Sequence, residues 1–378
     1  MTPRAVYASL LHRIFGAGSA TFDVIDARSN SVIGALAHPT DFLQFKSNFE
    51  ERLRRLSVAI QADTMLGKEV LATVNRIVDA GWDGAYAELC ALDYFLAAPE
   101  TGPGKILLDR TVCAASTLAS EMGMQYANHD MSFLDLGISM DTKLLSDKTG
   151  EILNGIFSDY RAAKGIKRLL IVPSYDLDDD FEQYSANRKA LLKELIDGVD
   201  TAARPDTFRS AVIPGLSYAF AWNAGVYFGE GVYSPHEHAK NHHPLLFGHA
   251  KKFSRNEPSL ITFVIFPWSG EKVFPFDDSK RTFFKKLGEH FFNDYLSSGE
   301  PATKFNKKFK SAMSAGDVTK YLSGVIYLED ACITASDPKQ LNIDASFIWN
   351  ANAAHSLANH ALEAALRHRG ACDLSAFK

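Results

Sequence analysis

The sequence has little of what marks a disulfide-rich or thiolate-based protein. Its 378 residues include four cysteines, Cys90, Cys113, Cys332 and Cys372, and none of these forms a Cys-x-x-Cys pair with another. Each cysteine lies among apolar or small residues, which is typical of a free buried thiol. We therefore expect neither a disulfide framework nor a zinc site built from thiolates.

Long apolar runs are also missing. The most apolar stretches, residues 260–268 and 211–225, are too short or too often interrupted by Pro, Gly and polar residues to cross a bilayer. The first residues lack the long apolar stretch and the small-residue cleavage site of a secretory signal. We expect a soluble protein that stays in the cytoplasm.

The chain has no excess of positive charge. A formal net charge of -5 argues against a protein that coats nucleic acid without specificity, because neutralising phosphates needs clustered Lys and Arg. A local basic face is still compatible with this charge, and one is found between residues 280 and 310. Its members are Lys280, Arg281, Lys285, Lys286, Lys304, Lys307, Lys308 and Lys310. The alternative is that these residues form an ordinary solvated helix surface.

The chain contains enough apolar residues, 46% of the total, to bury one large core and a smaller appendage. Residues 1–80 have a helical pattern, with apolar residues three and four positions apart from residue 41 onward. Further along, short apolar strands alternate with helical patterns, which predicts an α/β fold with a mixed sheet covered on both faces. We expect this α/β core to span residues 81–360, with an insertion around residues 175–240 and a tail at residues 361–378.

One pair of predicted strands carries polar side chains on a single face. In residues 138–143, Ser139, Asp141 and Lys143 alternate with apolar residues, so a carboxylate and an ammonium group share one face. Residues 130–133 alternate likewise, and residues 134–137 form a plausible turn between the two strands. A hairpin would bring either Asp130 or Asp135 near Asp141. The alternative is a hairpin whose outer face is simply polar.

Glu88 is the other notable carboxylate. The helix predicted for residues 85–97 has an apolar stripe that includes Glu88, one helical step from Leu92. A carboxylate on a core-facing stripe is costly unless it is paired or binds a metal. Alternatively, Glu88 lies at the edge of the stripe and reaches solvent.

The order of these residues resembles that of the PD-(D/E)xK nuclease superfamily, which has the restriction-endonuclease-like fold. A helix carries Glu88, a strand carries Asp130, and the next strand ends in Asp141-Thr142-Lys143. A basic helix, residues 244–255, then leads into an apolar strand at residues 260–266, as in the family's second core helix and strand. The resemblance implies Glu88, Asp130, Asp141 and Lys143 as catalytic residues.

The resemblance also implies a cofactor and a partner. Asp130, Asp141 and Glu88 would bind Mg²⁺ or Mn²⁺, because such hard cations take oxygen ligands. Lys143 would orient or help to deprotonate the attacking water and offset charge on the phosphate. The expected partner is nucleic acid, with DNA expected before RNA. The sequence is also compatible with a homodimer. The residues expected to contact nucleic acid are Lys251, Lys252, Arg255, Lys304, Lys307 and Lys308.

Two other function classes compete with a nuclease. One is a zinc hydrolase built on a cluster of His236, His238, His242, His243 and His249, with Glu237 among them. Pro244 interrupts that region, however, and the His-Glu-x-x-His order is missing. The other is a non-catalytic DNA-binding or scaffold protein that keeps a nuclease-like fold. No nucleophile elbow, Walker A loop or dinucleotide-binding glycine pattern occurs, so ATP-driven chemistry is not expected.

Overall fold

The computed structural model describes residues 1–61, 63–97, 105–145, 148–166, 169–174, 181–222, 235–236, 239, 244–268 and 277–377. The chain divides into two compact units, one made of Met1–Leu145 with His243–Lys378 and the other of Ser146–His242. Within the described ranges, no helix has the length and the apolar character needed to cross a membrane.

The first unit is built on a seven-stranded mixed sheet in the order β1-β2-β3-β7-β8-β9-β10. The strands are β1 (Ile106–Cys113), β2 (Tyr126–Phe133), β3 (Ile138–Leu144), β7 (Ser259–Ile265), β8 (Gly324–Asp330), β9 (Ile343–Trp349) and β10 (Cys372–Asp373). β1, β2 and β3 form an antiparallel meander, whereas β3, β7 and β8 run parallel to one another. The expected α/β class with a mixed sheet flanked by helices is thus confirmed.

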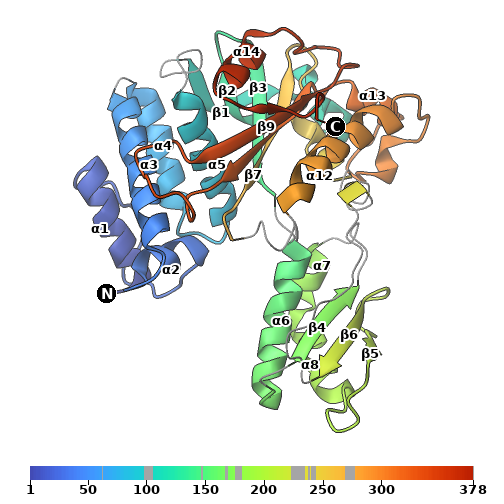
Figure 1. Cartoon of the computed structure of the whole chain (residues 1–378). Helices are drawn as coiled ribbons and strands as arrows, with labels where there is room; N and C mark the ends of the chain where they lie inside the picture. Colours follow the sequence, from blue (N-terminus) through green and yellow to red (C-terminus); the bar gives the residue numbers. More distant parts are fainter. Residues whose placement is uncertain are drawn as a thin grey trace. The chain divides into compact units, whose positions relative to one another are not determined.

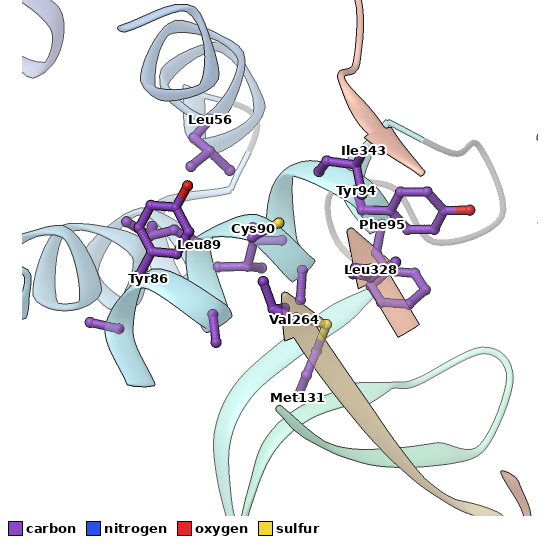
Figure 2. Close-up of a cluster of buried hydrophobic side chains, with 14 of the residues drawn as sticks. Leu56, Tyr86, Leu89, Cys90, Tyr94, Phe95, Met131, Val264, Leu328 and Ile343 are labelled. Carbon is purple, nitrogen blue, oxygen red and sulfur yellow. The ribbon is translucent and has the colours of Figure 1, made fainter. Parts of the chain in front are cut away.

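Helices from the N-terminal part of the chain cover one face of this sheet (Figure 1). They are α1 (Pro3–Phe15), α2 (Ser31–Ala37), α3 (Leu43–Gln61), α4 (Thr64–Arg76) and α5 (Trp82–Leu96). Figure 2 shows side chains of α5, such as Leu89 and Phe95, close to Met131, Val264 and Leu328 of the strands. α5 is apolar on nearly every side because other helices cover the faces that the sheet does not.

The opposite face of the sheet is covered by elements from the C-terminal half of the unit. These elements include α10 (Pro244–Gly248), the short 3₁₀ turn η4 (Ala250–Lys252), α12 (Asp277–Glu289), the π-helical turn η5 (His290–Asp294) and α13 (Ala315–Thr319). Tyr327 of β8 stacks on Phe284 of α12 and donates a hydrogen bond to its carbonyl oxygen at 3.0 Å. Tyr327 alternates with Ile326 and Leu328, which belong to the core below α5, so α12 lies on the other side.

The remaining short elements of this unit are η2 (Ala114–Ser116), η3 (Leu118–Met122), η6 (Ala302–Lys304) and α14 (Ala361–His368). α14 and β10 fall in the segment that the sequence suggests is a tail. β10 pairs with β9 in the main sheet, and Leu362 and Leu366 of α14 belong to the same core. The C-terminal residues are therefore part of the folded unit, because this sheet edge and these apolar side chains need partners.

The second unit has a core of its own. Its strands β4 (Leu169–Ser174), β5 (Thr207–Arg209) and β6 (Ser217–Trp222) form an antiparallel sheet in the order β4-β6-β5. Its helices are α6 (Lys148–Lys164), α7 (Phe181–Ala186) and α8 (Arg188–Gly198). The sequence places the insertion around residues 175–240, whereas this unit spans Ser146–His242 and so includes α6 and β4.

Candidate functional site

The site begins with the pairing of β2 and β3. Met131 pairs with Met140 and Phe133 with Ile138, so the same antiparallel register places Asp130 opposite Asp141 one residue further along. Met131 and Met140 point into the core below α5. Because side chains alternate along a strand, Asp130 and Asp141 project from the other face of the sheet. The apolar pattern of the hairpin therefore fixes the two carboxylates side by side.

Hydrogen bonds and ion pairs hold Asp130 against β3. The backbone N–H of Thr142 donates to Asp130 Oδ2 at 2.9 Å, and Lys143 Nζ donates to the same oxygen at 3.2 Å. Lys143 Nζ also lies 3.0 Å from Asp141 Oδ1. One ammonium group thus bridges both carboxylates, as the alternation of residues 138–143 predicts for Asp141 and Lys143.

Two further side chains reach the carboxylates from the segment after α10. Lys252, the last residue of η4, contacts Asp130 Oδ1 and Asp141 Oδ1. His249, which precedes η4, has its Nδ1 3.0 Å from Asp141 Oδ2. These two residues are three positions apart, so a single helical turn presents both to the same place. That spacing places the two side chains on one side of the turn, but by itself it does not indicate that they contact Asp130 and Asp141.

Burial and mutual repulsion shift the ionisation of the two aspartates. Asp141 is 2% exposed, and Asp130 is also largely buried. Burial raises the pKa of Asp130 to about 7, and the neighbouring Asp141 carboxylate adds to this rise against the opposing effects of Lys143 and Lys252. Burial acts in the same direction on Asp141, but contacts with Asp130, His249 and Lys143 outweigh it and lower the pKa of Asp141 well below its usual range. Asp141 is therefore the ionised member of the pair near neutral pH.

Lys143 responds in the opposite sense. Burial lowers the pKa of its ammonium group, but Asp141 and Asp130 outweigh burial and raise this pKa above its ordinary value. Lys143 stays protonated at neutral pH and acts as a hydrogen-bond donor. Its side chain is 35% exposed, so it can also face a ligand that arrives from solvent.

Glu88 does not join the two aspartates. Its carboxylate is paired with Arg76 of α4 and accepts a hydrogen bond from Thr73 Oγ1 at 3.3 Å. Burial raises the pKa of Glu88, Arg76 opposes this effect, and the charge of Lys143 is felt more weakly. The structure thus differs from the sequence-based interpretation of Glu88 as a catalytic metal ligand, because a cation on the neighbouring helix already neutralises it.

Asp135, the rival of Asp130, lies on the turn between β2 and β3. Its side chain is 64% exposed, and its carboxylate lies 3.7 Å from Lys105 Nζ. The register of the hairpin brings Asp130, and not Asp135, opposite Asp141.

The oxygen and nitrogen donors of the site determine whether it can hold a divalent cation. Within the described part of the chain, no group of three or more His, Cys, Asp and Glu side chains is arranged to hold a metal ion. The expected trio of Asp130, Asp141 and Glu88 is therefore not assembled. Two adjacent buried carboxylates do fit Mg²⁺, because this ion keeps several waters and needs only one or two protein carboxylates. Asp130 and Asp141 are the residues that would hold it.

Three of the residues expected to contact nucleic acid are already engaged within the protein. Lys252 binds the aspartates, Arg255 pairs with Glu121 and lies over the ring of Tyr321, and Lys304 pairs with Glu300 at 2.7 Å. Pairing also affects the wider basic stretch, since Lys280 lies 3.3 Å from Glu329. These basic residues are thus partly neutralised by carboxylates that lie beside them.

Lys251 and Lys308 are nearer to the site, and Lys307 and Lys308 are exposed. Burial lowers the pKa of Lys251, and repulsion from Lys252, Lys308 and Lys143 adds to the shift while Asp141 opposes it. Lys251 therefore lies within electrostatic range of Lys252, Lys308, Lys143 and Asp141.

The histidine cluster divides between described and undescribed parts of the chain. Glu237, His238, His242 and His243 lie outside the described residues, so the zinc alternative stays a prediction. His249 contacts Asp141, as stated above.

Comparisons with known protein families, with curated proteins and with solved structures found no match to this chain.

Proposed function

We propose that this chain is a metal-dependent nuclease that hydrolyses phosphodiester bonds in nucleic acid, DNA in the first place. Asp130, Asp141 and Lys143 are its proposed catalytic residues. The observation that carries the proposal is their convergence: two neighbouring strands place two buried carboxylates side by side with one ammonium group on both. Carboxylates whose pKa values are driven apart in this way are typical of functional sites.

The order of elements supports a restriction-endonuclease-like core within the mixed sheet. Helix α5 precedes β2 and β3, which carry the aspartates, and the segment containing α10 and η4 leads into β7. β7 lies beside β3 and parallel to it. This is the succession of helix, strands, second helical segment and apolar strand that the resemblance implies.

The proposed reaction forms a bond between a water oxygen and phosphorus, breaks the bond from phosphorus to one sugar oxygen, and returns a proton to that leaving oxygen. A Mg²⁺ or Mn²⁺ ion held by Asp130 and Asp141 would lower the pKa of the attacking water and offset the charge of the phosphate. Because Lys143 stays protonated, we assign it to orienting the water and stabilising the developing negative charge, and not to accepting the water's proton.

Lys251 and Lys308 are the proposed contacts to phosphates flanking the scissile bond. Lys251 is repelled by Lys252, Lys308 and Lys143, and this repulsion is only partly offset by Asp141. A polyanionic strand would relieve this repulsion. The basic residues farther along the chain, Lys304 and Lys307, are secondary candidates.

A second candidate function, a non-catalytic DNA-binding or scaffold protein, is favoured by one observation. Lys143 and Lys252 together balance the charges of Asp130 and Asp141, as in a structural ion-pair network. Such a network would need neither a metal nor a substrate.

The deciding experiment incubates the protein with plasmid, linear duplex and single-stranded DNA and with RNA, in Mg²⁺, Mn²⁺ or EDTA. We expect cleavage only with a divalent metal. Asp141→Asn should reduce it to background, because it removes the negative charge that would hold the metal. Lys143→Met should reduce it by about 100-fold or more, because it removes the ammonium group that would stabilise charge on the reacting phosphate.

Asp135→Asn is the matched control, since it makes the same chemical change on the same hairpin outside the carboxylate pair. It should leave cleavage and melting temperature close to those of the wild-type protein. Cleavage by Asp141→Asn at the wild-type rate, or equal cleavage in EDTA, would exclude the proposed site. No cleavage of any substrate, with lower melting temperatures for Asp141→Asn and Lys143→Met, would favour the structural ion-pair network.

A further inference from the structure

The position of Lys252 is unusual for a residue of a metal site. Its ammonium group contacts one oxygen of Asp130 and one of Asp141, and its side chain is 11% exposed. Asp141 Oδ1 lies against both Lys252 and Lys143. The carboxylate oxygens that a divalent cation would use are thus already in contact with ammonium groups.

The charges of this cluster are balanced. Two carboxylates face two ammonium groups, so the formal charge of Asp130, Asp141, Lys143 and Lys252 is zero when the acids are ionised. Adding a divalent cation without moving a lysine would leave the buried cluster with two excess positive charges, which is costly in a region of low dielectric constant. A cation can therefore bind well only if an ammonium group moves away or an anion arrives with it.

Lys252 is the group better placed to move. Both side chains have a flexible four-carbon stem, but Lys143 is carried by β3, the strand that also carries Asp141, whereas Lys252 belongs to a single 3₁₀ turn. A displaced Lys252 ammonium would join the surroundings of Lys251 and Lys308, where burial and repulsion by neighbouring lysines lower the pKa of Lys251. An incoming phosphate would stabilise it there.

We propose that Lys252 is a tethered counter-cation that competes with the divalent metal for Asp130 and Asp141, so that metal and nucleic acid bind cooperatively. This inference rests on the proposed nuclease function. It adds that the metal binds weakly to the free protein and more tightly once a phosphate of the substrate holds the displaced ammonium group of Lys252. By linkage, the metal raises the affinity for nucleic acid by the same factor. Lys252 acts here as a positioning residue, through its occupation of the metal's ligands.

The test measures binding of Mn²⁺ alone to the full chain by calorimetry and by electron paramagnetic resonance. Lys252→Met should bind Mn²⁺ about tenfold more tightly than the wild-type protein, within the usual range of coupling between linked sites. Lys252→Gln, which keeps N–H donors for both carboxylates but carries no charge, should do the same and carries the test if the methionine variant fails to fold.

Lys251→Met is the matched control. It removes one positive charge from the same turn, and Lys251 is in electrostatic range of Asp141 without an ion pair to it within the described structure. Its effect on Mn²⁺ affinity should stay within about threefold, because a more distant charge is screened by solvent and salt. An equal gain in Mn²⁺ affinity in Lys251→Met and Lys252→Met would mean that the total positive charge near the site, and not contact of Lys252 with the carboxylates, limits metal binding.

A second readout is the binding of fluorescently labelled duplex DNA, followed by anisotropy as Ca²⁺ is added. The wild-type protein should gain affinity with the metal, and Lys252→Gln should lose most of this dependence. Unchanged Mn²⁺ affinity in both Lys252 variants would overturn the inference and leave the nuclease proposal intact. If Mn²⁺ binds to none of these proteins, or binds as well to Asp141→Asn, the metal site itself fails and the proposed function fails with it.

Discussion

The pairing of β2 and β3 brings together two carboxyl groups whose pKa values differ. Asp130 and Asp141 have the same side chain, but the pKa of the first is raised to about 7 and that of the second is lowered. Burial acts on both groups in the same direction, so their contacts determine the difference. The hydrogen bond between the two carboxyl groups and the contact with His249 favour the charged form of Asp141, which leaves Asp130 as the group that titrates near neutral pH.

The raised pKa of Asp130 predicts how stability depends on pH in the metal-free protein. Between its ordinary pKa of 3.8 and about 7, folded Asp130 holds a proton that the unfolded chain has released. The contribution of this group to the free energy of unfolding therefore falls as the pH rises through that interval. His129 acts in the opposite sense: burial, helped by Arg110, lowers its pKa to about 4, so its contribution grows as the pH rises towards its ordinary value of 6.5.

The variant Asp130→Asn separates the two contributions. It removes the carboxyl group but leaves His129, and the pKa values of Asp141 and Lys143 lie outside this interval. The stability of the wild-type protein minus that of the variant, measured by urea unfolding in EDTA, should fall as the pH is raised from about 4 to about 7. A difference that is constant over this interval would show that Asp130 titrates normally.

Glu88 gives a second prediction at the level of single residues. Since its carboxylate is engaged by Arg76 and Thr73, Glu88→Gln should change cleavage by less than about tenfold, whereas Asp141→Asn is expected to abolish it. The loss of a partly exposed ion pair should cost no more than about 1 kcal/mol. Steady-state cleavage and Mn²⁺ affinity check this, and a loss of both in a folded Glu88→Gln protein would return Glu88 to the metal site.

Local patterns predict the strands well where apolar residues alternate or run together. The strands predicted at residues 130–133, 138–143 and 260–266 each have a counterpart in the sheet. The sequence does not predict β1, because Asp109, Arg110 and Thr111 give it no clear apolar alternation. The predicted helix at residues 244–255 is instead split into α10 and η4. The approach of Lys252 and His249 to the aspartates depends on tertiary packing that no local pattern contains.

The turn of the β2–β3 hairpin gives a prediction at the level of elements. Gly137 has a φ of 60°, and a Cβ added there would meet nothing within 4 Å. Gly137→Ala should therefore cost about 1–2 kcal/mol through backbone strain alone. Pairing of Met131 with Met140 continues to hold the register, so cleavage per folded molecule should be retained.

Gly84 offers the matched control for this change. It lies in α5 without a positive φ, and an added Cβ again meets nothing within 4 Å. Gly84→Ala should stabilise the protein by about 0.5–1 kcal/mol, because alanine favours the helix. Urea unfolding of both variants tests the opposite signs, and equal effects would refute the explanation by backbone conformation.

At the scale of the whole molecule, the candidate site belongs to one unit only. Asp130, Asp141, Lys143, His249 and Lys252 all lie in the unit made of Met1–Leu145 and His243–Lys378. The chain leaves this unit directly after β3 and returns just before α10, so the second unit is inserted between two elements that supply site residues. The two units bury separate clusters of apolar side chains.

Separate cores predict separate unfolding. Leu195 of α8 and Leu328 of β8 are each 0% exposed and belong to different clusters, so Leu195→Ala and Leu328→Ala are the same change in the two cores. Each substitution should lower the free energy of unfolding of its own unit by about 2–5 kcal/mol.

Hydrogen exchange, measured by mass spectrometry, should then become faster in residues 148–222 for Leu195→Ala, and in β3, β7 and β8 for Leu328→Ala. Cleavage should survive the first change and become heat-sensitive with the second, because only the second loosens the strands that carry the aspartates. Faster exchange throughout the chain in Leu195→Ala would mean that the protein unfolds as one cooperative body.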